Sequence, residues 1–304
     1  MSTLNLSREE WLQYRKAGIG GSDAGAICGL NPYRTAMQVY QDKISDACED
    51  IDNEAMRQGR EFEDYVARRF MEATGKKVRR ANTMFRSKNH PFMLADVDRM
   101  IVGENAGLEC KTASPYMEDK WKDGKIPMSY QVQCHHYMAV CGADAWYIAV
   151  LIYGREFKYY KIERNEALIA DLVRIEQDFW ENHVQKGIMP APDGSKTADS
   201  VIAEYYKISV PESVRLSGFD EKLQRRQDLL DVITRMENEK NQIEQEIKMY
   251  MGTAEIAENE HYRISWKSVS SGRIDEKRLK EELPQIYEKY KKMKVSRRFS
   301  IKAA

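Results

Sequence analysis

The spacing of apolar residues along this chain changes from a period of about 3.6 to a period of two and back again. Residues 53–73 carry apolar side chains at helical spacing, and Gly75 follows them as a stop. Short segments rich in β-forming residues come next, at 83–87, 92–98, 99–103 and 107–113. A helix at about 128–141, two strands and a helix from Asn165 to near Gln185 complete the series. This order predicts an α/β domain with a central mixed sheet flanked by helices, rather than a bundle or a sandwich.

Capping residues mark shorter helices before the sheet region. Ser7 and Glu10 form a capping box, and Thr35 follows a turn as the next cap. Between them, glycines precede Ser22 and Asp23, either of which is able to cap a short helix. The N-terminal region is therefore expected to be helical.

The region after residue 187 has a different character. Residues 187–200 are expected to form a loop. From Phe219 to Tyr250 the sequence is rich in Glu and Lys, with apolar residues at helical spacing. This pattern predicts one long helix or a coiled-coil arm that ends at Gly252.

Short elements are expected beyond the arm. Residues 261–270 alternate as a strand, a helix is interrupted or begins near Pro284, and residues 297–302 are expected to form a final strand. The expected domains are therefore an α/β domain at 1–212 and, at 213–304, a helical arm with a small α+β domain.

The balance of charges limits how the chain is able to hold nucleic acid. Its 304 residues include 48 Lys and Arg and 48 Asp and Glu, so the net charge is zero. The zero net charge argues against attachment to DNA by overall charge, so a DNA-binding role has to depend on local patches. The candidates are the basic runs at 75–80 and 291–299, which solvated surface faces explain equally well.

Several missing signals narrow the class of protein. There is no run of about 18 apolar residues and no apolar signal region at the start, so a cytoplasmic protein without a membrane span is expected. The five cysteines lack Cys-x-x-Cys spacing and are expected to be reduced. The run Cys134-His135-His136 does not predict zinc, because neighbouring residues on a helix face different ways.

The segment GLECKTA at 107–113 places two opposite charges on one face of a half-buried strand. Because side chains alternate along a strand, Glu109 and Lys111 point away from the side that carries Leu108 and Cys110. Spacing alone favours a structural ion pair at a strand edge, since carboxylates and lysines are frequent in this chain. The position of the Glu109–Lys111 pair, within two apolar strands joined by a short turn, favours a functional site instead.

A third charge is expected beside this pair. Asp98 ends a strand, and a hairpin of the next two strands returns it close to Glu109. Two carboxylates at strand ends suit Mg²⁺, with the backbone carbonyl of Cys110 as a further ligand. Lys111 would then orient or deprotonate a metal-bound water that attacks a phosphodiester. Asp96, which points to the same face as Asp98, is the alternative ligand.

The segment LADVDRMIVGENAGLECKTA at 94–113 resembles the core of the PD-(D/E)XK nucleases, in the branch of YqaJ-type viral recombinases that includes lambda exonuclease. The resemblance extends over residues 8–200, approximately. Further segments resemble family motifs in the family's order, at 14–33, 59–70 and 130–151. Four motifs in sequence are far more specific than any one of them.

The resemblance implies roles for residues at the matching positions. Asp98 and Glu109 correspond to the metal ligands, and Glu63 completes the acidic site from the preceding helix. Lys111 corresponds to the catalytic lysine, and Gln131 to a residue that supports the water or the phosphate.

Arg15 and Ser22 match the positions that the family uses to capture the 5′-phosphate of DNA. Ser22 opens a helix, where free backbone amides favour an anion, and Arg15 adds a cationic fork. The simpler alternative is that Arg15 is an exposed surface residue and Ser22 only a cap.

The chain departs from the family at the metal aspartate. The family usually has Pro-Asp-Gly there, whereas this sequence has Val97-Asp98-Arg99. The turn is expected to be looser, and Arg99 to reach a phosphate.

The resemblance implies a Mg²⁺-dependent exonuclease, with Mn²⁺ as a substitute metal. Such an enzyme degrades linear duplex DNA from 5′ ends and leaves 3′ single-stranded tails for phage-type recombination. A single-strand annealing protein as partner, a ring-shaped homotrimer and a phage or prophage setting in a bacterial host are implied as well. The alternatives are a structure-specific endonuclease on the same metal site, and a catalytically silent protein that binds DNA ends or a partner.

Overall fold

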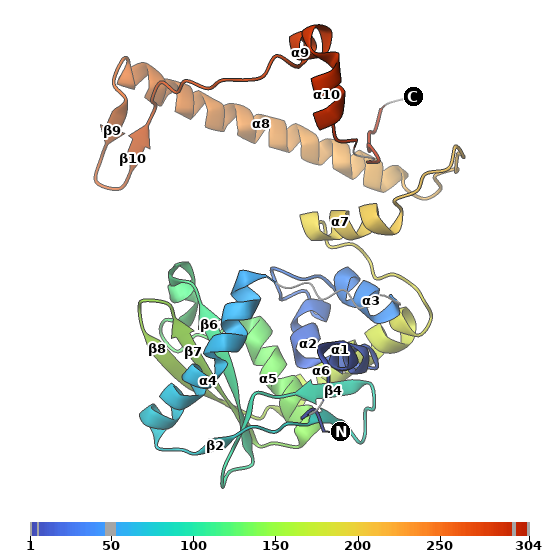
Figure 1. The fold of residues 1–304 in the computed structure, drawn as a ribbon, viewed down its shortest axis with the longest axis vertical. Helices are drawn as coiled ribbons and strands as arrows, with labels where there is room; N and C mark the ends of the chain where they lie inside the picture. The colour runs from blue at the N-terminus through green and yellow to red at the C-terminus, as the bar shows by residue number, and fades with distance from the viewer. Residues whose placement is uncertain (1, 5, 46–52, 294–295, 303–304) are drawn as a thin grey trace. The chain divides into compact units, whose positions relative to one another are not determined.

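The computed structural model of the protein describes residues 2–4, 6–45, 53–293 and 296–302. The chain separates into two compact units, Met1–Lys207 and Ile208–Ala304, whose elements are drawn in Figure 1. The first unit has the mixed α/β fold that the sequence predicts, and the second contains the expected long helix.

A five-stranded sheet forms the centre of the first unit. Its strands, in spatial order, are β2 (Val78–Arg79), β5 (Arg99–Ile101), β6 (Ala106–Ala113), β7 (Ala145–Ile152) and β8 (Phe157–Glu163). Strands β6 and β7 run parallel, while the other neighbours are antiparallel, so the sheet is mixed. A parallel pair requires a crossover connection, and α5 (Met128–Cys141) lies in the connection between these two strands.

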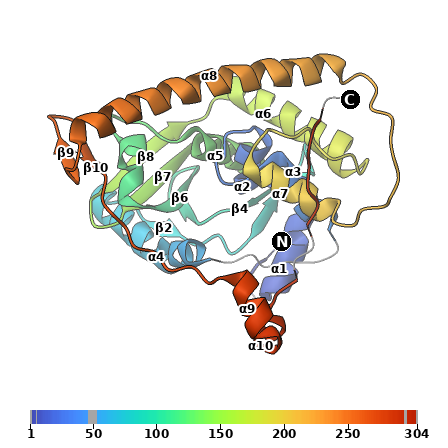
Figure 2. The same cartoon turned by 90° about the horizontal axis from the view of Figure 1, so that it is seen from above.

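Helices cover both faces of this sheet. Helix α4 (Glu54–Thr74) packs on one face, where Phe70 lies in a cluster with Leu108 of β6. Helix α5 packs on the other face, where Met138 lies in a cluster with Trp146 of β7. Figure 2 shows α4 and α5 on either side of β6 and β7. Both faces of the sheet are therefore buried, which explains the nearly continuous apolar run of β7.

Smaller elements complete the first unit. A second sheet has the order β1 (Ile19–Gly20), β4 (Met93–Asp96) and β3 (Met84–Arg86), with β1 parallel to β4. The remaining helices are α1 (Arg8–Lys16), α2 (Gly21–Ile27), α3 (Ala36–Ile44), a 3₁₀ helix (Pro115–Trp121), α6 (Glu166–Phe179), a π-helical turn (Trp180–Val184) and α7 (Lys196–Tyr205).

The structure corrects the predicted start of α2. Its N-cap is Gly20, and neither Ser22 nor Asp23 caps it. Asp23 is the third residue of the helix, and its side chain accepts a hydrogen bond from the Gly20 N–H at 3.0 Å. The prediction failed because a carboxylate at this position satisfies the cap amide from inside the helix.

The loop expected at 187–200 is also partly wrong, because α7 begins inside it. Ser195 caps the helix by accepting from the Ala198 N–H at 3.0 Å. Ala198 and Val201 are buried in a cluster with Met37. The stability of α7 therefore depends on packing against α3, which the local sequence does not predict.

The two basic runs differ in what the structure shows of them. The run at 75–80 contains β2, whose Val78 and Arg79 pair with Ile101 and Met100 of β5. It is therefore partly an edge strand of the sheet rather than only a solvated loop. Residues 294 and 295 of the run at 291–299 lie outside the described residues.

The second unit begins with α8 (Asp220–Met251) and Gly252 at its C-cap, as the sequence predicts. A hairpin of β9 (Ile256–Glu258) and β10 (Arg263–Ser265) follows, and then α9 (Glu276–Glu282) and α10 (Pro284–Tyr290). The predicted final strand at 297–302 is wrong, because this segment pairs with no strand and alternation alone does not supply a partner. Pairing of α8 in a coiled coil stays a prediction. Across the described part of the chain, no helix combines the length and apolar character needed to cross a membrane.

Candidate active site

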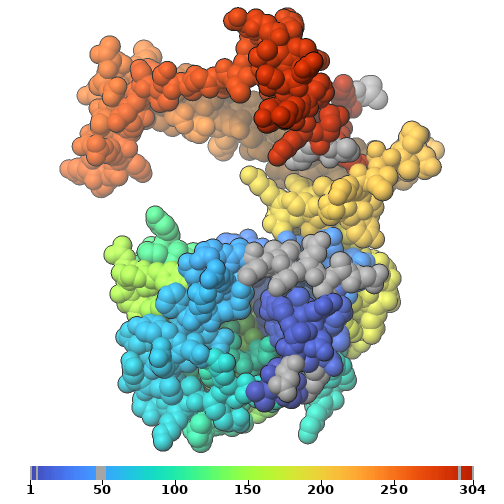
Figure 3. Space-filling model, viewed as in Figure 1, coloured from blue at the N-terminus to red at the C-terminus, as the bar shows by residue number. Residues whose placement is uncertain are grey.

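A cavity of about 480 Å³ opens on the first unit, with walls that include α1, α4 and β6. Figure 3 shows a recess between α4, in light blue, and α1, in dark blue. Most of the residues singled out in the sequence line this cavity: Arg15, Ser22, Glu63, Asp96, Asp98, Glu109, Cys110 and Lys111. One hollow therefore brings together the expected acidic centre and the expected anion site.

Glu109 and Lys111 lie on the face of β6 that α5 covers, as the alternation of the strand predicts. Lys111 Nζ is 2.6 Å from Glu109 Oε1, and the amide of Gln133 on α5 donates to the same oxygen at 2.8 Å. The other oxygen, Glu109 Oε2, is buried and has no hydrogen-bond partner among the described residues. A buried carboxylate oxygen without a donor is a position where a bound cation is favourable.

Asp98 reaches the same place from the end of β4. The backbone N–H of Cys110 donates to Asp98 Oδ2 at 2.7 Å. Burial, followed by the negative charges of Glu109 and Glu63, raises the pKa of Asp98 well above its ordinary value, although Lys111 opposes this shift. The carboxylates therefore repel one another, and a cation between them would relieve that repulsion.

These groups fit a hard divalent cation such as Mg²⁺. Asp98 and Glu109 offer carboxylate oxygens, and Cys110 lies on the same wall. Within the described ranges, no three His, Cys, Asp or Glu side chains form a ready-made metal site. Mg²⁺ does not require such a set, because it keeps several waters and takes one or two carboxylates together with substrate phosphates.

Glu63 of α4 also lines the cavity, but it is already paired. Arg99 of β5 forms ion pairs with Glu63 and with Asp64, and its Nη1 donates to the Asp98 carbonyl at 2.5 Å. Arg99 is only 4% exposed. The expectation that Arg99 reaches a phosphate is therefore wrong, because its side chain is buried against the acidic residues of α4.

Asp96, the alternative ligand, is engaged elsewhere. It lines the cavity, but its Oδ2 accepts a hydrogen bond from Trp11 Nε1 of α1 at 2.6 Å. Asp98 is the carboxylate that touches β6, beside Glu109. The geometry thus favours Asp98 over Asp96 for a cation.

The structure does not bring Gln131 to the cavity. Its amide donates to the carbonyl of Ile126 at 2.8 Å, whereas Gln133 lines the cavity and bonds to Glu109. Residues two apart on a helix point about 200° apart, so both glutamines cannot face the site. The signal that identifies Gln133 is its spacing of one helical turn from the buried Tyr137, to whose hydroxyl it donates at 2.8 Å.

Arg15 and Ser22 meet at the cavity from α1 and α2. Arg15 Nη2 donates to Ser22 Oγ at 2.9 Å, and its guanidinium lies 4.8 Å from the centre of the Trp11 ring. The Arg15 side chain remains 28% exposed, so it is within reach of an incoming anion. The Ser22 hydroxyl is neutral, so this hydrogen bond adds no negative charge beside Arg15.

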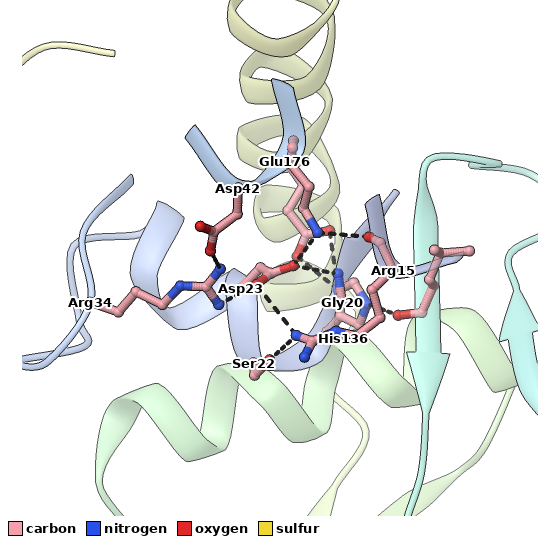
Figure 4. Close-up of polar contacts among 10 residues, drawn as sticks. Arg15, Gly20, Ser22, Asp23, Arg34, Asp42, His136 and Glu176 are labelled. Atoms are coloured by element: carbon pink, nitrogen blue, oxygen red, sulfur yellow. Dashed lines mark hydrogen bonds and ion pairs between the residues drawn. The ribbon is translucent and has the colours of Figure 1, made fainter. Parts of the chain in front are cut away.

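Asp23 is the buried carboxylate around which the cationic side chains of this corner gather, as Figure 4 shows. The carboxylate is fully buried, with Arg34 Nη1 at 2.6 Å, Lys43 Nζ at 2.7 Å and Arg15 Nη2 at 3.7 Å. Burial alone would raise the pKa of Asp23, but these three cations hold it well below its ordinary value. Asp23 is therefore ionised at neutral pH and anchors Arg15.

The two histidines of the Cys-His-His run do not form a metal site with each other. His136 is fully buried, and its Nδ1 lies 2.8 Å from Glu176 Oε1 on α6 (Figure 4). Its Nε2 lies 2.8 Å from the carbonyl of Leu94 on β4. Both ring nitrogens are thus used in tying α5 to α6 and to β4.

The chain is similar to known proteins both in sequence and in fold. A family model described as the YqaJ-like viral recombinase domain matches residues 10–144. A Bacillus subtilis (strain 168) protein named "Uncharacterized protein YqaJ" is 41% identical, over 98% of this chain and 95% of that protein.

Among solved structures, the alkaline exonuclease LHK-Exo from Laribacter hongkongensis superposes with a TM-score of 0.52 at 20% identity, over 59% of this chain and 94% of that one. A complex of LHK-Exo with dAMP gives the same TM-score at 21% identity, over the same shares of the two chains. This likeness is one of fold.

Proposed function

The chain belongs to the YqaJ-like viral recombinase family, and from that premise we propose that it is a Mg²⁺-dependent exonuclease that degrades linear duplex DNA from its 5′ ends. Family and fold support a nuclease, and the direction, the metal and the 3′ single-stranded product are parts of the proposal. The observation that carries it is the single cavity, which contains both an acidic centre and a separate cationic corner.

The acidic centre suits cleavage of a phosphodiester. A bound Mg²⁺, or Mn²⁺ in its place, would be held by Asp98, Glu109 and the Cys110 carbonyl, and would polarise the phosphate and activate a water. Gln133 fixes the Glu109 carboxylate through its 2.8 Å hydrogen bond, and Lys111 lies against the same carboxylate. The Lys111 ammonium is thereby placed to orient the attacking water and to offset charge that develops on the phosphate.

The cationic corner suits the terminal phosphate of the strand. Arg15 presents a partly exposed guanidinium, and Ser22 adds a hydroxyl. A strand whose 5′-phosphate occupies this corner would present its next phosphodiester to the acidic centre in the same cavity. This arrangement selects DNA ends, which supports an exonuclease over an endonuclease. The LHK-Exo complex contains dAMP, a nucleoside monophosphate of the class that such an enzyme releases.

Further parts of the proposal depend on the family resemblance. They are a nuclease domain at residues 1–212, a homotrimer that encloses DNA, a single-strand annealing protein as partner, and a phage or prophage origin with action in the cytoplasm of a bacterial host. Enclosure would explain how a chain of zero net charge stays on DNA. Exposed apolar side chains on α8, such as Ile233, Met236 and Ile243, support an interaction role for residues 213–304.

The test uses linear duplex DNA with 5′-phosphate or 5′-hydroxyl ends and covalently closed circular duplex, each with Mg²⁺ or with EDTA. We expect loss of the linear DNA alone, faster with 5′-phosphate, and a fall of at least about 100-fold in rate for Lys111→Ala. Lys161→Ala is the matched control, because Lys161 lies on β8 outside the cavity and pairs with Glu163. Cutting of the circle would identify an endonuclease, and no metal-dependent cleavage of any substrate would leave a DNA-end or partner-binding role.

A further inference from the structure

Helix α8 is one continuous helix of 32 residues, drawn in Figure 1, and almost all of them are exposed. Met251 is the one buried residue within it, and Ile247 is half-buried. The apolar side chains of Met236 and Ile243 are 63% and 53% exposed. Since helices in proteins owe most of their stability to the packing of an apolar face, a helix of this kind favours a partner along its length.

The apolar residues of α8 repeat in the pattern of a coiled coil. Between residues 229 and 250 they follow one another in alternating steps of four and three residues, which keeps them on the side of the helix that meets a second helix. We call this line of residues the seam: Leu229, Ile233, Met236, Lys240, Ile243, Ile247 and Tyr250. Its period therefore specifies a helix as the occupant.

The positions on either side of the seam carry one sign of charge. These flanking positions are where paired helices exchange ion pairs, which set the choice of partner. From residue 237 onward they are all acidic: Glu237, Glu239, Glu244 and Glu246. Lys240 lies 3.7 Å from Glu244 and is the one cation between residues 237 and 247. The exposed face of α8 thus combines an apolar seam with acidic flanks.

Two copies of this chain fit each other poorly along this face. Because the flanks of both copies carry the same glutamates, Glu meets Glu whichever way the two helices run. In a parallel pair equivalent positions face each other, so Lys240 would also meet its own copy. Nucleic acid is disfavoured for a similar reason, since the glutamates repel its phosphates.

The charges specify the kind of helix that this face accepts. We propose that the seam of α8 docks an amphipathic helix of a different protein, with apolar residues against the seam and lysine or arginine beside the acidic flanks. Opposite charges at these positions select the partner and fix its register, while burial of the seam supplies the affinity. This inference rests on the interaction role proposed for residues 213–304 and adds the chemistry of the partner.

The test measures the binding of two labelled synthetic peptides to the full chain by fluorescence anisotropy. Both peptides have about four heptads with leucine or isoleucine at the seam positions, and they carry either lysine or glutamate at the flanking positions. We expect the lysine peptide to bind at least about 10-fold more tightly than the glutamate peptide. Equal affinity for the two peptides, or no binding of either, would overturn the inference.

Charge reversal within the chain shows whether the flanks cause this preference. Glu239→Lys combined with Glu244→Lys should abolish or reverse it. Asp228→Lys combined with Asp231→Lys is the matched control, because it makes the same change of charge at positions outside the seam and its flanks. An equal effect of the two double variants would show that net charge alone attracts the peptide, and the inference would fail.

A pair of single variants tests the seam itself. Ile243→Ser should weaken binding of the lysine peptide at least about 10-fold, because the interface loses a buried apolar side chain. Met249→Ser is the matched control, since Met249 lies outside the seam and is 82% exposed. Both side chains are exposed in the free chain, so neither substitution disturbs a core. Equal affinities of the two variants would contradict docking along the seam.

Two further results separate this inference from a second copy as occupant and from the proposed function. Sedimentation of the full chain should give the same oligomeric state for the wild type and for Ile243→Ser, whereas dissociation of the variant would identify α8 as a contact between copies and overturn the inference. Binding of the lysine peptide by a chain that cleaves no DNA would reject the exonuclease and keep the docking site. Cleavage of linear DNA by a chain that binds neither peptide would do the reverse.

Discussion

At the scale of single residues, the two oxygens of the Glu109 carboxylate at the centre of the cavity have different surroundings. One oxygen is occupied by both Lys111 and Gln133, and the other has no donor among the described residues. A carboxylate held in this way is fixed in orientation while keeping one free acceptor. The neutral Gln133 amide therefore matters as much to the geometry as the charged lysine does.

The two glutamines of α5 provide a test of that role. Gln133→Ala should lower the rate of DNA cleavage by about 10-fold to 100-fold, because a hydrogen bond to a charged group contributes about 1.5–3 kcal/mol. Gln131→Ala should change the rate little, since its amide bonds to the carbonyl of Ile126 and not to the site. Initial rates on 5′-phosphorylated linear duplex measure both. Equal losses in the two variants would contradict the assignment of Gln133.

At the scale of secondary-structure elements, one buried pair connects three of them. His136 of α5 contacts Glu176 of α6 and the Leu94 carbonyl of β4, the strand that leads to Asp98. Burial alone would lower the pKa of His136, but Glu176 and the hydrogen bonds raise it above its ordinary value of 6.5. The charged form of the ring is therefore more stable in the folded protein than in the unfolded chain.

This pair predicts a pH dependence of stability. A histidine with a raised folded-state pKa contributes its stabilisation fully below pH 6.5, and this contribution is lost as pH rises through the folded-state pKa. His136→Gln should destabilise the fold most below pH 6.5, because it removes a charged ring that is more stable in the folded protein than in the unfolded chain. Burial raises the pKa of Glu176, so this carboxyl is able to take up a proton at low pH when its partner is lost. The difference from wild type should then shrink as pH rises.

The measurement is urea unfolding at several pH values between about 6 and 9, on either side of an ordinary histidine pKa. Tryptophan fluorescence is a suitable signal, because most tryptophans lie before residue 208. His261→Gln is the control, since His261 is exposed in the second unit. A gap between wild type and His136→Gln that grows with pH would show that the sign of the shift is wrong.

The same elements show how far the sequence predicts the structure. The alternation of β6 predicts the side on which Glu109 and Lys111 lie, because period two is a local property that burial reinforces. The start of α7 was missed because its stability depends on packing against Met37, more than 150 residues away. The pairing of Arg99 with Glu63 was missed for the same reason, since no local pattern encodes a contact between β5 and α4.

At the scale of the whole molecule, the cavity belongs to one unit. All residues that line it lie between Arg8 and Tyr137, whereas the second unit begins at Ile208. The proposed chemistry and the proposed interactions of α8 therefore belong to different parts of the chain.

Truncation tests this division. A chain that ends at Lys207 should fold and keep Mg²⁺-dependent cleavage of short linear duplexes within about an order of magnitude of the full chain, because a compact unit with its own core is able to fold alone. The truncated Lys111→Ala variant is the background control. Loss of cleavage in a folded truncation would show that residues 208–304 contribute to the site.

The three cations around Asp23 have a consequence for the thermodynamics of binding. Fixing a free arginine side chain in one conformation costs about 2 kcal/mol of rotamer entropy. Arg15 is held by Ser22, by the Trp11 ring and by the field of Asp23 without any ligand. Much of that ordering thus takes place when α1 and α2 dock during folding. An anion that arrives at this guanidinium meets a rigid receptor, so its affinity is limited by desolvation rather than by disorder.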